Sequence, residues 1–241
     1  MEKLVTPENL RNFTYINDAI CQKPIKGIVM WCMGAGAKDV IAEENSHGEF
    51  FAKLGILYIQ PYYNPWAWMN SFTRAFVDEI IAAVLKKHNL PDDIPFAVTG
   101  SSMGGLSSLV YITHAHRNFV SCTVNATICD PMLYAQCGAS IRTFYSALYH
   151  EPYDFETAIR SISPIHLVDR MPNIEYHFFH GEVDVGTPYE LHAGRLAEAL
   201  RAKGYPVTTE IMPGLGHAYP PPERFQVFLQ YSADAILKQY Q

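Results

Sequence analysis

Three polar side chains in this chain have the types and spacing that acyl transfer needs: a serine, an aspartate and a histidine, all close to glycines. The serine lies in Gly100-Ser101-Ser102-Met103-Gly104-Gly105, where glycines stand two residues either side of Ser102. Ser101 is flanked at the same distance by Thr99 and Met103, so Ser102 is the candidate nucleophile. A serine hydroxyl is a weak nucleophile at neutral pH and needs a base within hydrogen-bond reach.

A candidate base and a candidate acid follow later in the chain. His217 ends the run Pro213-Gly214-Leu215-Gly216-His217 and is the candidate base. Asp184, in His180-Gly181-Glu182-Val183-Asp184, is the candidate carboxylate that orients the imidazole. Glu182 is a rival for that role, because either carboxylate can serve, but we favour Asp184.

The other histidines have simpler interpretations. His114 and His116 close a predicted helix, where a positive imidazole would complement the helix dipole. His177 and His180 are three residues apart on or beside a predicted strand, so they point to opposite faces and make a poor metal pair. His47 is expected at a solvated helix position. The sequence has no zinc spacing and no calcium loop, so we expect no catalytic metal and no cofactor.

A strand and a helix must hold the candidate nucleophile. The apolar run 94–99 predicts a buried parallel strand just before it, and residues 106–115 predict a helix just after it. A serine at such a corner lies on a sharp, strained turn, and small flanking residues let the strand and helix pack closely. The position as well as the letters therefore indicate a nucleophile elbow at Ser102.

The remaining elements alternate as in a parallel sheet. Runs 174–179 and 207–212 predict strands whose carboxyl ends bring Asp184 and His217 to one edge. Further strands are expected at 13–16, 28–32, 56–60 and 120–128, and helices at 41–54, 71–88, 189–203 and 222–239. We predict an α/β fold with a mostly parallel central sheet and helices on both faces. The 241 residues are expected to form one domain with a small cap insertion at about 130–163.

These motifs resemble the α/β-hydrolase superfamily, and within it the dienelactone-hydrolase-like esterases and the catalytic domain of prolyl-oligopeptidase-like serine hydrolases. The resemblance rests on GSSMGG around Ser102, HGEVDVGTP around Asp184 and GLGH ending at His217, and it covers residues 25–240. It implies that Ser102 is the nucleophile, that His217 is the general base and acid, and that Asp184 orients the imidazole. It also implies the α/β-hydrolase fold.

The resemblance further implies two donors that hold the oxyanion. One is the backbone N–H of Met103, the residue after the nucleophile. The second should come from Cys32-Met33-Gly34-Ala35-Gly36, where members usually carry a His-Gly-Gly type sequence, and Met33 or Gly34 can still donate a backbone N–H. A prolyl-oligopeptidase type enzyme would tend to use a tyrosine hydroxyl in this loop. The loop contains no tyrosine, which counts against a peptidase.

Two aromatic segments, 61–70 and 130–163, leave the carboxyl ends of strands, the edge where open sheets bind ligands. Their candidate substrate-binding residues are Tyr63, Trp66, Trp68 and Tyr145. Tryptophans in a loop either pack under a neighbouring element or line a pocket, and packing is slightly favoured. If the two segments meet above Ser102, they form an aromatic cleft suited to a flat acyl group or a sugar ring.

We therefore expect a serine esterase that acts on a small or medium ester, including aryl and carbohydrate esters. A peptidase or amidase of the prolyl-oligopeptidase type is the alternative, although such enzymes normally carry a gating domain for which we see no room in 241 residues. A catalytically silent binding protein on a hydrolase scaffold is a third hypothesis, because fold does not fix function.

Composition limits the partners. A net charge of -6 gives no basic patch for nucleic acid or for an anionic membrane. The five cysteines have no metal or redox spacing and suit a reducing cytoplasm; they are Cys21, Cys32, Cys122, Cys129 and Cys137. Residues 1–7 lack the apolar core of a signal peptide, and no apolar run is long enough to span a membrane. Exposed aromatic loops leave open whether the chain forms a homodimer.

Overall fold

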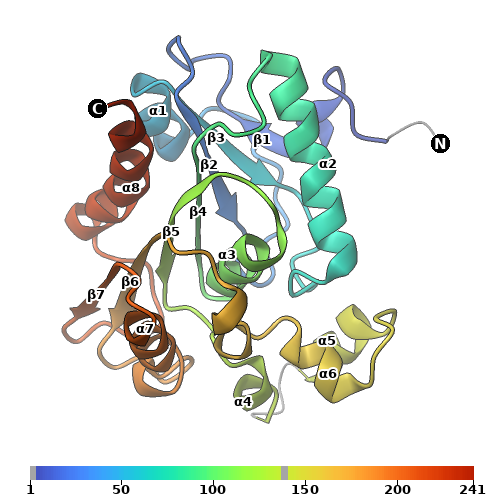
Figure 1. Cartoon of the computed structure of the whole chain (residues 1–241), viewed down its shortest axis with the longest axis vertical. Helices are drawn as coiled ribbons and strands as arrows, with labels where there is room; N and C mark the ends of the chain where they lie inside the picture. The colour runs from blue at the N-terminus through green and yellow to red at the C-terminus, as the bar shows by residue number, and fades with distance from the viewer. Residues whose placement is uncertain (1–3, 137–140) are drawn as a thin grey trace.

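One seven-stranded sheet, in the order β1-β3-β2-β4-β5-β6-β7, runs through the computed structural model, which describes residues 4–136 and 141–241 (Figure 1). The strands are β1 (Thr14–Ile16), β2 (Gly27–Cys32), β3 (Ile56–Pro61), β4 (Phe96–Ser101), β5 (Phe119–Asn125), β6 (Glu175–Gly181) and β7 (Val207–Met212). Only β1 is antiparallel to its neighbour; the other pairs are parallel. Cys137 and the first three residues of the N-terminal segment lie outside the described residues.

The central strands are buried on both faces, which explains why they are continuous apolar runs in the sequence. Their register aligns their carboxyl ends. Cys32 of β2 pairs with Gly100 of β4, and Ser101 of β4 pairs with Asn125 of β5. The loops that leave β2, β4, β6 and β7 therefore start from one edge of the sheet.

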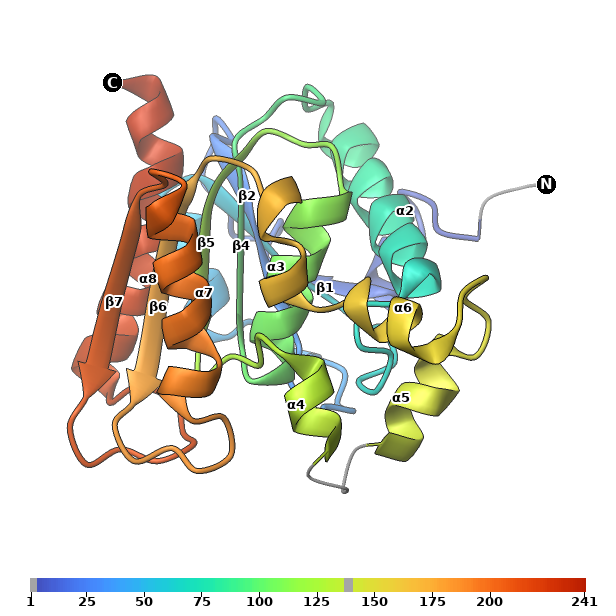
Figure 2. The same cartoon turned by 60° about the horizontal axis from the view of Figure 1, so that its bottom comes forward.

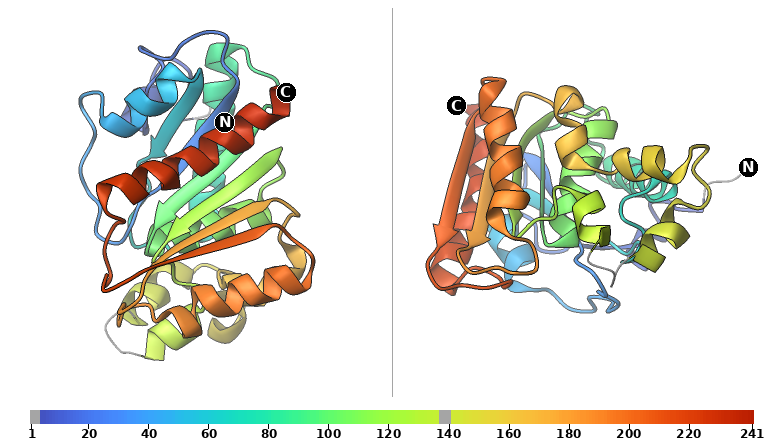
Figure 3. Two further views of the ribbon diagram at one scale, coloured as in Figure 1. Left: turned by 90° about the vertical axis from the view of Figure 1, so that its left-hand side faces the viewer. Right: turned by 90° about the horizontal axis from the view of Figure 1, so that it is seen from below.

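Helices cover both faces of this sheet, as the predicted fold class requires. On one face lie α1 (Ser46–Lys53) and α8 (Pro222–Leu237), whose apolar residues pack on β2 to β6 (Figure 3). On the other lie α2 (Ser71–His88), α3 (Met103–His114) and α7 (Ala193–Ala202), which form the larger part of the core. Short 3-10 turns are η1 (Leu10–Asn12), η2 (Pro164–His166), η3 (Val168–Arg170), η4 (Tyr189–Leu191) and η5 (Lys238–Tyr240).

Between β5 and β6 the chain forms α4 (Pro131–Gln136), α5 (Ile141–Leu148) and α6 (Phe155–Arg160). In Figure 2 these helices lie beside α2 and α3, with α4 and α5 toward the end at which β6 and β7 finish. The loop 61–70 packs against α5. The indole of Trp68 stacks on Phe144 at 4.0 Å between ring centroids, and Asn70 Nδ2 donates to the carbonyl of Ala147 at 2.7 Å. The two aromatic segments thus contact each other.

Most predicted elements are shifted by only a few residues in the structure, and three of the differences have a clear physical reason. The helix expected from residue 41 begins at Ser46, because Asn45 caps it by accepting from the N–H of Gly48 at 2.9 Å. The strand expected to reach residue 128 ends at Asn125, because Ala126 has a φ of 44°. The helix expected over 189–203 is broken at His192 into a 3-10 turn and α7.

Candidate active site

The turn between β4 and α3 holds Ser102 in a conformation that L-residues rarely adopt, with φ 57° and ψ −122°. Close backbone approach explains the glycines around it. A Cβ at Gly100 would lie 2.5 Å from the carbonyl of Gly104, and a Cβ at Gly104 would overlap the carbonyl oxygen of Cys32. The N–H of Ser102 donates to the carbonyl of Asn125 at 2.9 Å, which fixes the turn to β5. The side chain of Ser102 stays partly exposed at the edge of the sheet.

Loops after β6 and β7 bring the other two candidates to this serine. His217 Nε2 lies 2.9 Å from Ser102 Oγ, and its Nδ1 lies 2.8 Å from Asp184 Oδ2. The side chain of His217 is 39% exposed, whereas the Asp184 carboxyl is fully buried. The structure therefore places the three side chains in one continuous chain of hydrogen bonds that runs from solvent into the protein.

The turn after Asp184 supplies most of the hydrogen bonds that its carboxyl accepts. Oδ1 accepts the N–H groups of Gly186 at 2.8 Å and Thr187 at 2.9 Å, and Oδ2 accepts the Thr187 hydroxyl at 2.8 Å as well as His217. Burial raises the pKa of Asp184, but hydrogen bonds from Thr187 and His217 outweigh it, so the pKa lies below its usual range. The ionised carboxylate only accepts, so the proton of the hydrogen bond between Asp184 and His217 lies on Nδ1.

Two residues that support the turn at Asp184, Thr187 and His180, were not predicted from the sequence to do so. Thr187 was not among the candidates, although an aspartate two residues before Gly186 is typical of an Asx-turn. His180 is completely buried and donates from Nε2 to the carbonyl of Thr187 at 2.7 Å. Burial lowers the pKa of His180, so it is neutral and supports the turn without competing as a cation for the carboxylate.

Glu182, the rival acid, points elsewhere. Its side chain is exposed, and Oε2 accepts the N–H of Gly214 at 2.9 Å. It thereby holds the loop that precedes His217. The structure thus brings Asp184 to the imidazole and gives Glu182 a loop contact.

The segment after β2 lies directly against the serine turn. The Cys32–Met33 peptide contacts Gly104, and a Cβ at Gly34 would lie 3.5 Å from the carbonyl of Ser101. The candidate donors Met33 and Gly34 are therefore beside the turn. The N–H of Met103 belongs to the first turn of α3, where helices leave N–H groups without an intrahelical partner.

Comparison with known proteins shows to which family this chain belongs. Residues 73–233, more than half of the chain, match the model of the prolyl oligopeptidase family. The chain belongs to the prolyl oligopeptidase family. Its members are serine hydrolases, and the resemblance to the α/β-hydrolase superfamily is confirmed.

Several solved structures share the fold of this chain. A puromycin-hydrolyzing peptidase from Mycobacterium tuberculosis is 20% identical with a TM-score of 0.72, over 90% of this chain and 34% of that one. An acylaminoacyl peptidase from Pyrococcus horikoshii is 13% identical with a TM-score of 0.72, over 88% and 37%. An S-formylglutathione hydrolase from Agrobacterium tumefaciens is 16% identical with a TM-score of 0.70, over 92% and 88%. The chain thus spans about a third of the length of these peptidases.

The four candidate substrate-binding aromatics separate into two groups. Trp68 is 1% exposed, so it takes the packed position that was slightly favoured, and its place among the substrate-binding candidates is wrong. Tyr63 is 4% exposed, yet it lines a cavity of about 320 Å³ together with Met33 and Pro65. Trp68 packs the loop onto α5, and the hydroxyl of Tyr63 donates to the carbonyl of Met33, in the segment 32–36, at 3.3 Å. Trp66 is 42% exposed and Tyr145 is 55% exposed. These two remain accessible to a ligand.

Trp66 also lies beside the segment 32–36. Its ring would be 3.9 Å from a Cβ at Gly36. It also lines a cavity of about 720 Å³ together with Asn70, Arg142 and His150. Tyr145 instead packs against Phe155, with 4.5 Å between ring centroids and the ring planes tilted by 44°, within the helices that follow β5.

Two expectations about histidines need correction. His47 is half-buried and packed among rings, 5.4 Å from Trp31 and 5.0 Å from Phe225 between centroids, and burial lowers its pKa. His114 does not complement the helix dipole as a cation. Burial and the nearby Arg74 lower the pKa of His114 to about 4, and its Nε2 donates to the carbonyl of Ser161 at 3.0 Å.

The cysteines that the structure describes are free and buried: Cys21, Cys32, Cys122 and Cys129. Burial raises the pKa of Cys32, the last residue of β2, to about 12. Across residues 4–136 and 141–241, no three His, Cys, Asp or Glu side chains gather closely enough to hold a metal ion. No helix within those ranges has the length and apolar character needed to cross a membrane.

Proposed function

We propose that this serine hydrolase is an esterase that cleaves small or medium carboxylic esters through an acyl-enzyme on Ser102. The observation that carries the proposal is the hydrogen-bond chain, with 2.9 Å from Ser102 Oγ to His217 Nε2 and 2.8 Å from His217 Nδ1 to Asp184 Oδ2. A nucleophile bonded to a base that a carboxylate orients is the arrangement that acyl transfer requires.

In the proposed reaction, Ser102 Oγ forms a bond to the ester carbonyl carbon while its proton passes to His217 Nε2. The N–H of Met103 and an N–H of Met33 or Gly34 would hold the oxyanion. The imidazolium then gives its proton to the departing alcohol oxygen, leaving the acyl group on Ser102. Water attacks the acyl-enzyme with His217 again as base, releasing the acid and restoring the serine. Asp184 stays ionised and stabilises the imidazolium throughout.

The oxyanion loop favours esters over amides. Residues 32–36 contain no tyrosine, and the two tyrosines of the neighbouring loop have other partners. Tyr62 shares its hydroxyl with the backbone of Ile41, and Tyr63 donates to the carbonyl of Met33. Only backbone donors are then proposed for the oxyanion, which suits an ester with its better leaving group. The exposure of His217 also leaves the site open to small substrates.

A peptidase or amidase is the second candidate. Membership of the prolyl oligopeptidase family supports it, as do the similar structures of a puromycin-hydrolyzing peptidase and an acylaminoacyl peptidase. The S-formylglutathione hydrolase, which this chain matches over most of both lengths, is in turn consistent with the esterase. Relative turnover of esters and amides decides between the two.

The test uses p-nitrophenyl esters from acetate to octanoate, a feruloyl ester, and prolyl and alanyl p-nitroanilides, with wild type and Ser102→Ala. We expect ester hydrolysis that disappears in the variant and exceeds anilide hydrolysis in kcat/KM. Anilide turnover that equals or exceeds ester turnover would establish the amidase instead. Equal rates in wild type and variant, together with no labelling of Ser102 by a phosphonate, would leave a silent scaffold.

A further inference from the structure

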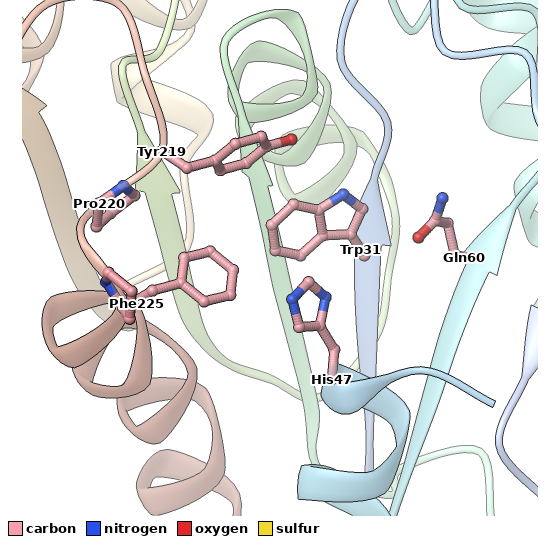
Figure 4. Close-up of a pocket in the computed structure, with 7 residues that line it drawn as sticks. Trp31, His47, Gln60, Tyr219, Pro220 and Phe225 are labelled. Atoms are coloured by element: carbon pink, nitrogen blue, oxygen red, sulfur yellow. The ribbon is translucent and has the colours of Figure 1, made fainter.

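A cavity of about 530 Å³ opens at the carboxyl edge of the sheet, on the face covered by α1 and α8 (Figure 4). We call it the aromatic pocket, and its walls include Trp31, His47, Gln60, Tyr219, Pro220 and Phe225. These residues come from β2, α1, β3, the loop after β7 and α8. The volume lies within the roughly 300–1,000 Å³ of small-molecule sites.

Two walls of the aromatic pocket continue directly into the candidate active site. Trp31 directly precedes the segment 32–36, which holds the proposed second oxyanion donor, and Tyr219 stands two residues after His217. Asn125 ties the second wall to the serine turn, since its Nδ2 donates to Ser101 Oγ at 2.9 Å and to the carbonyl of Ala218 at 3.0 Å. The pocket therefore adjoins the side of the site on which His217 lies.

Ring faces dominate the chemistry of the aromatic pocket. Trp31 lies 5.4 Å from His47 and 6.2 Å from Tyr219 between ring centroids, and Phe225 lies 5.0 Å from His47 and 6.0 Å from Tyr219. In Figure 4 the Trp31, His47, Tyr219 and Phe225 rings form one cluster, in which each ring contacts at least two of the others. Such walls bind flat aromatic groups by offset or edge contacts.

The polar groups of the pocket are neutral. Burial lowers the pKa of His47 and raises the pKa of Tyr219, so neither carries charge at neutral pH. Gln60 adds an amide, and among the residues that the structure describes, none that lines the pocket is a lysine, an arginine or a carboxylate. A charged group would lose hydration here without finding a counter-ion, so the pocket selects an uncharged ligand.

We propose that the aromatic pocket binds the aromatic alcohol portion of the ester, and this inference rests on the proposed esterase function. The direction of proton transfer places the alcohol on this side. His217 must protonate the departing oxygen, so the leaving group lies next to its Nε2 in the reaction. The wall formed by Tyr219 and Pro220 is the continuation of the His217 loop. The substrate class is therefore an ester of an uncharged arylmethyl or similar alcohol.

The test compares two acetates that share an acyl group, benzyl acetate and 2-methoxyethyl acetate. Both form the same acetyl-enzyme, so any preference caused by the alcohol is seen in kcat/KM and not in the hydrolysis of the acetyl-enzyme. We expect wild type to prefer the benzyl ester. Tyr219→Leu, which removes one ring, should reduce that preference by about two- to ten-fold, the effect of losing one aromatic contact. His47→Leu should reduce it similarly and guards against misfolding of the first variant.

The matched control is Tyr153→Leu, because Tyr153 and Tyr219 are each 56% exposed and Tyr153 lies outside the aromatic pocket. It should keep the wild-type preference. A second readout is the affinity of the Ser102→Ala protein for benzyl alcohol, measured by NMR titration. This affinity should be lower in the double variant that carries both Ser102→Ala and Tyr219→Leu.

Each contrary result has its own meaning. An active enzyme whose benzyl preference survives in both pocket variants would overturn the inference alone. A pocket variant that instead changes the ratio for methyl phenylacetate and methyl acetate would show that the pocket binds the acyl group, which also overturns it. Wild-type protein that hydrolyses no ester and whose Ser102 does not react with a phosphonate would overturn the proposed function and this inference together.

Discussion

Acid should destabilise this protein partly through His192, the residue between η4 and α7. It is 3% exposed, and its Nδ1 accepts the backbone N–H groups of Cys129 and Asp130, each at 3.3 Å. Burial lowers the pKa of His192 to about 4. A proton on Nδ1 would also face two N–H donors and cost both hydrogen bonds.

The sign and size of the effect follow from proton linkage. The unfolded chain has a histidine pKa of about 6.5, so between that value and about 4 the unfolded state binds more protons than the folded state. Stability therefore falls as pH falls through this window. The full difference is about 3 kcal/mol, of which about 2 kcal/mol is lost between pH 7 and pH 5. His177, with its pKa also lowered to about 4 by burial, contributes with the same sign.

His192→Asn tests this reasoning, because the asparagine Oδ1 can accept in place of Nδ1 and cannot be protonated. Urea unfolding followed by circular dichroism would give the free energy of unfolding at pH 7 and pH 5. Wild type should lose about 2 kcal/mol more than the variant over this interval. His116→Asn, at an exposed position, is the control and should lose as much as wild type. Equal losses in wild type and His192→Asn would refute the argument.

Three further predictions concern the site and its support. Gly104→Ala would push its Cβ into the carbonyl of Cys32, so we expect kcat/KM for esters to fall by about 10²-fold or more while circular dichroism still reports a folded chain. Asp184→Asn should lower kcat by about 10⁴-fold, whereas Glu182→Gln should change it less than about two-fold; comparable losses would contradict the assignment of the acid. Trp68→Ala should cost about 3–5 kcal/mol in urea unfolding, and a cost near zero would contradict its packing on α5.

The fold and the serine turn could be predicted because their signals are local. Glycines at both positions two residues from Ser102 reflect contacts that the structure shows between neighbouring turns of backbone. Parallel strands are buried on both faces, so each is a short apolar run that can be recognised without knowing its partners. The edge at which Asp184 and His217 meet followed from strand direction alone.

Tertiary contacts decide what the sequence could not predict. Trp68 and Trp66 are two residues apart in one loop, yet one is 1% exposed and the other 42%. Only the position of α5, far along the chain, distinguishes them. The support of Asp184 by His180 likewise depends on a buried hydrogen bond to the Thr187 carbonyl, for which the spacing of residues gives no signal.

The buried thiol of Cys32 allows the opening of the segment 32–36 to be measured without any measurement of catalysis. A thiol reacts as the thiolate, and this one is fully enclosed with its pKa raised to about 12 by burial, so alkylating reagents reach it only when the end of β2 opens. The rate at which Cys32 is alkylated in the native protein therefore reports how often the chain opens locally next to the serine turn. A ligand bound at the candidate active site should lower the alkylation rate of Cys32 even though it does not contact the sulfur.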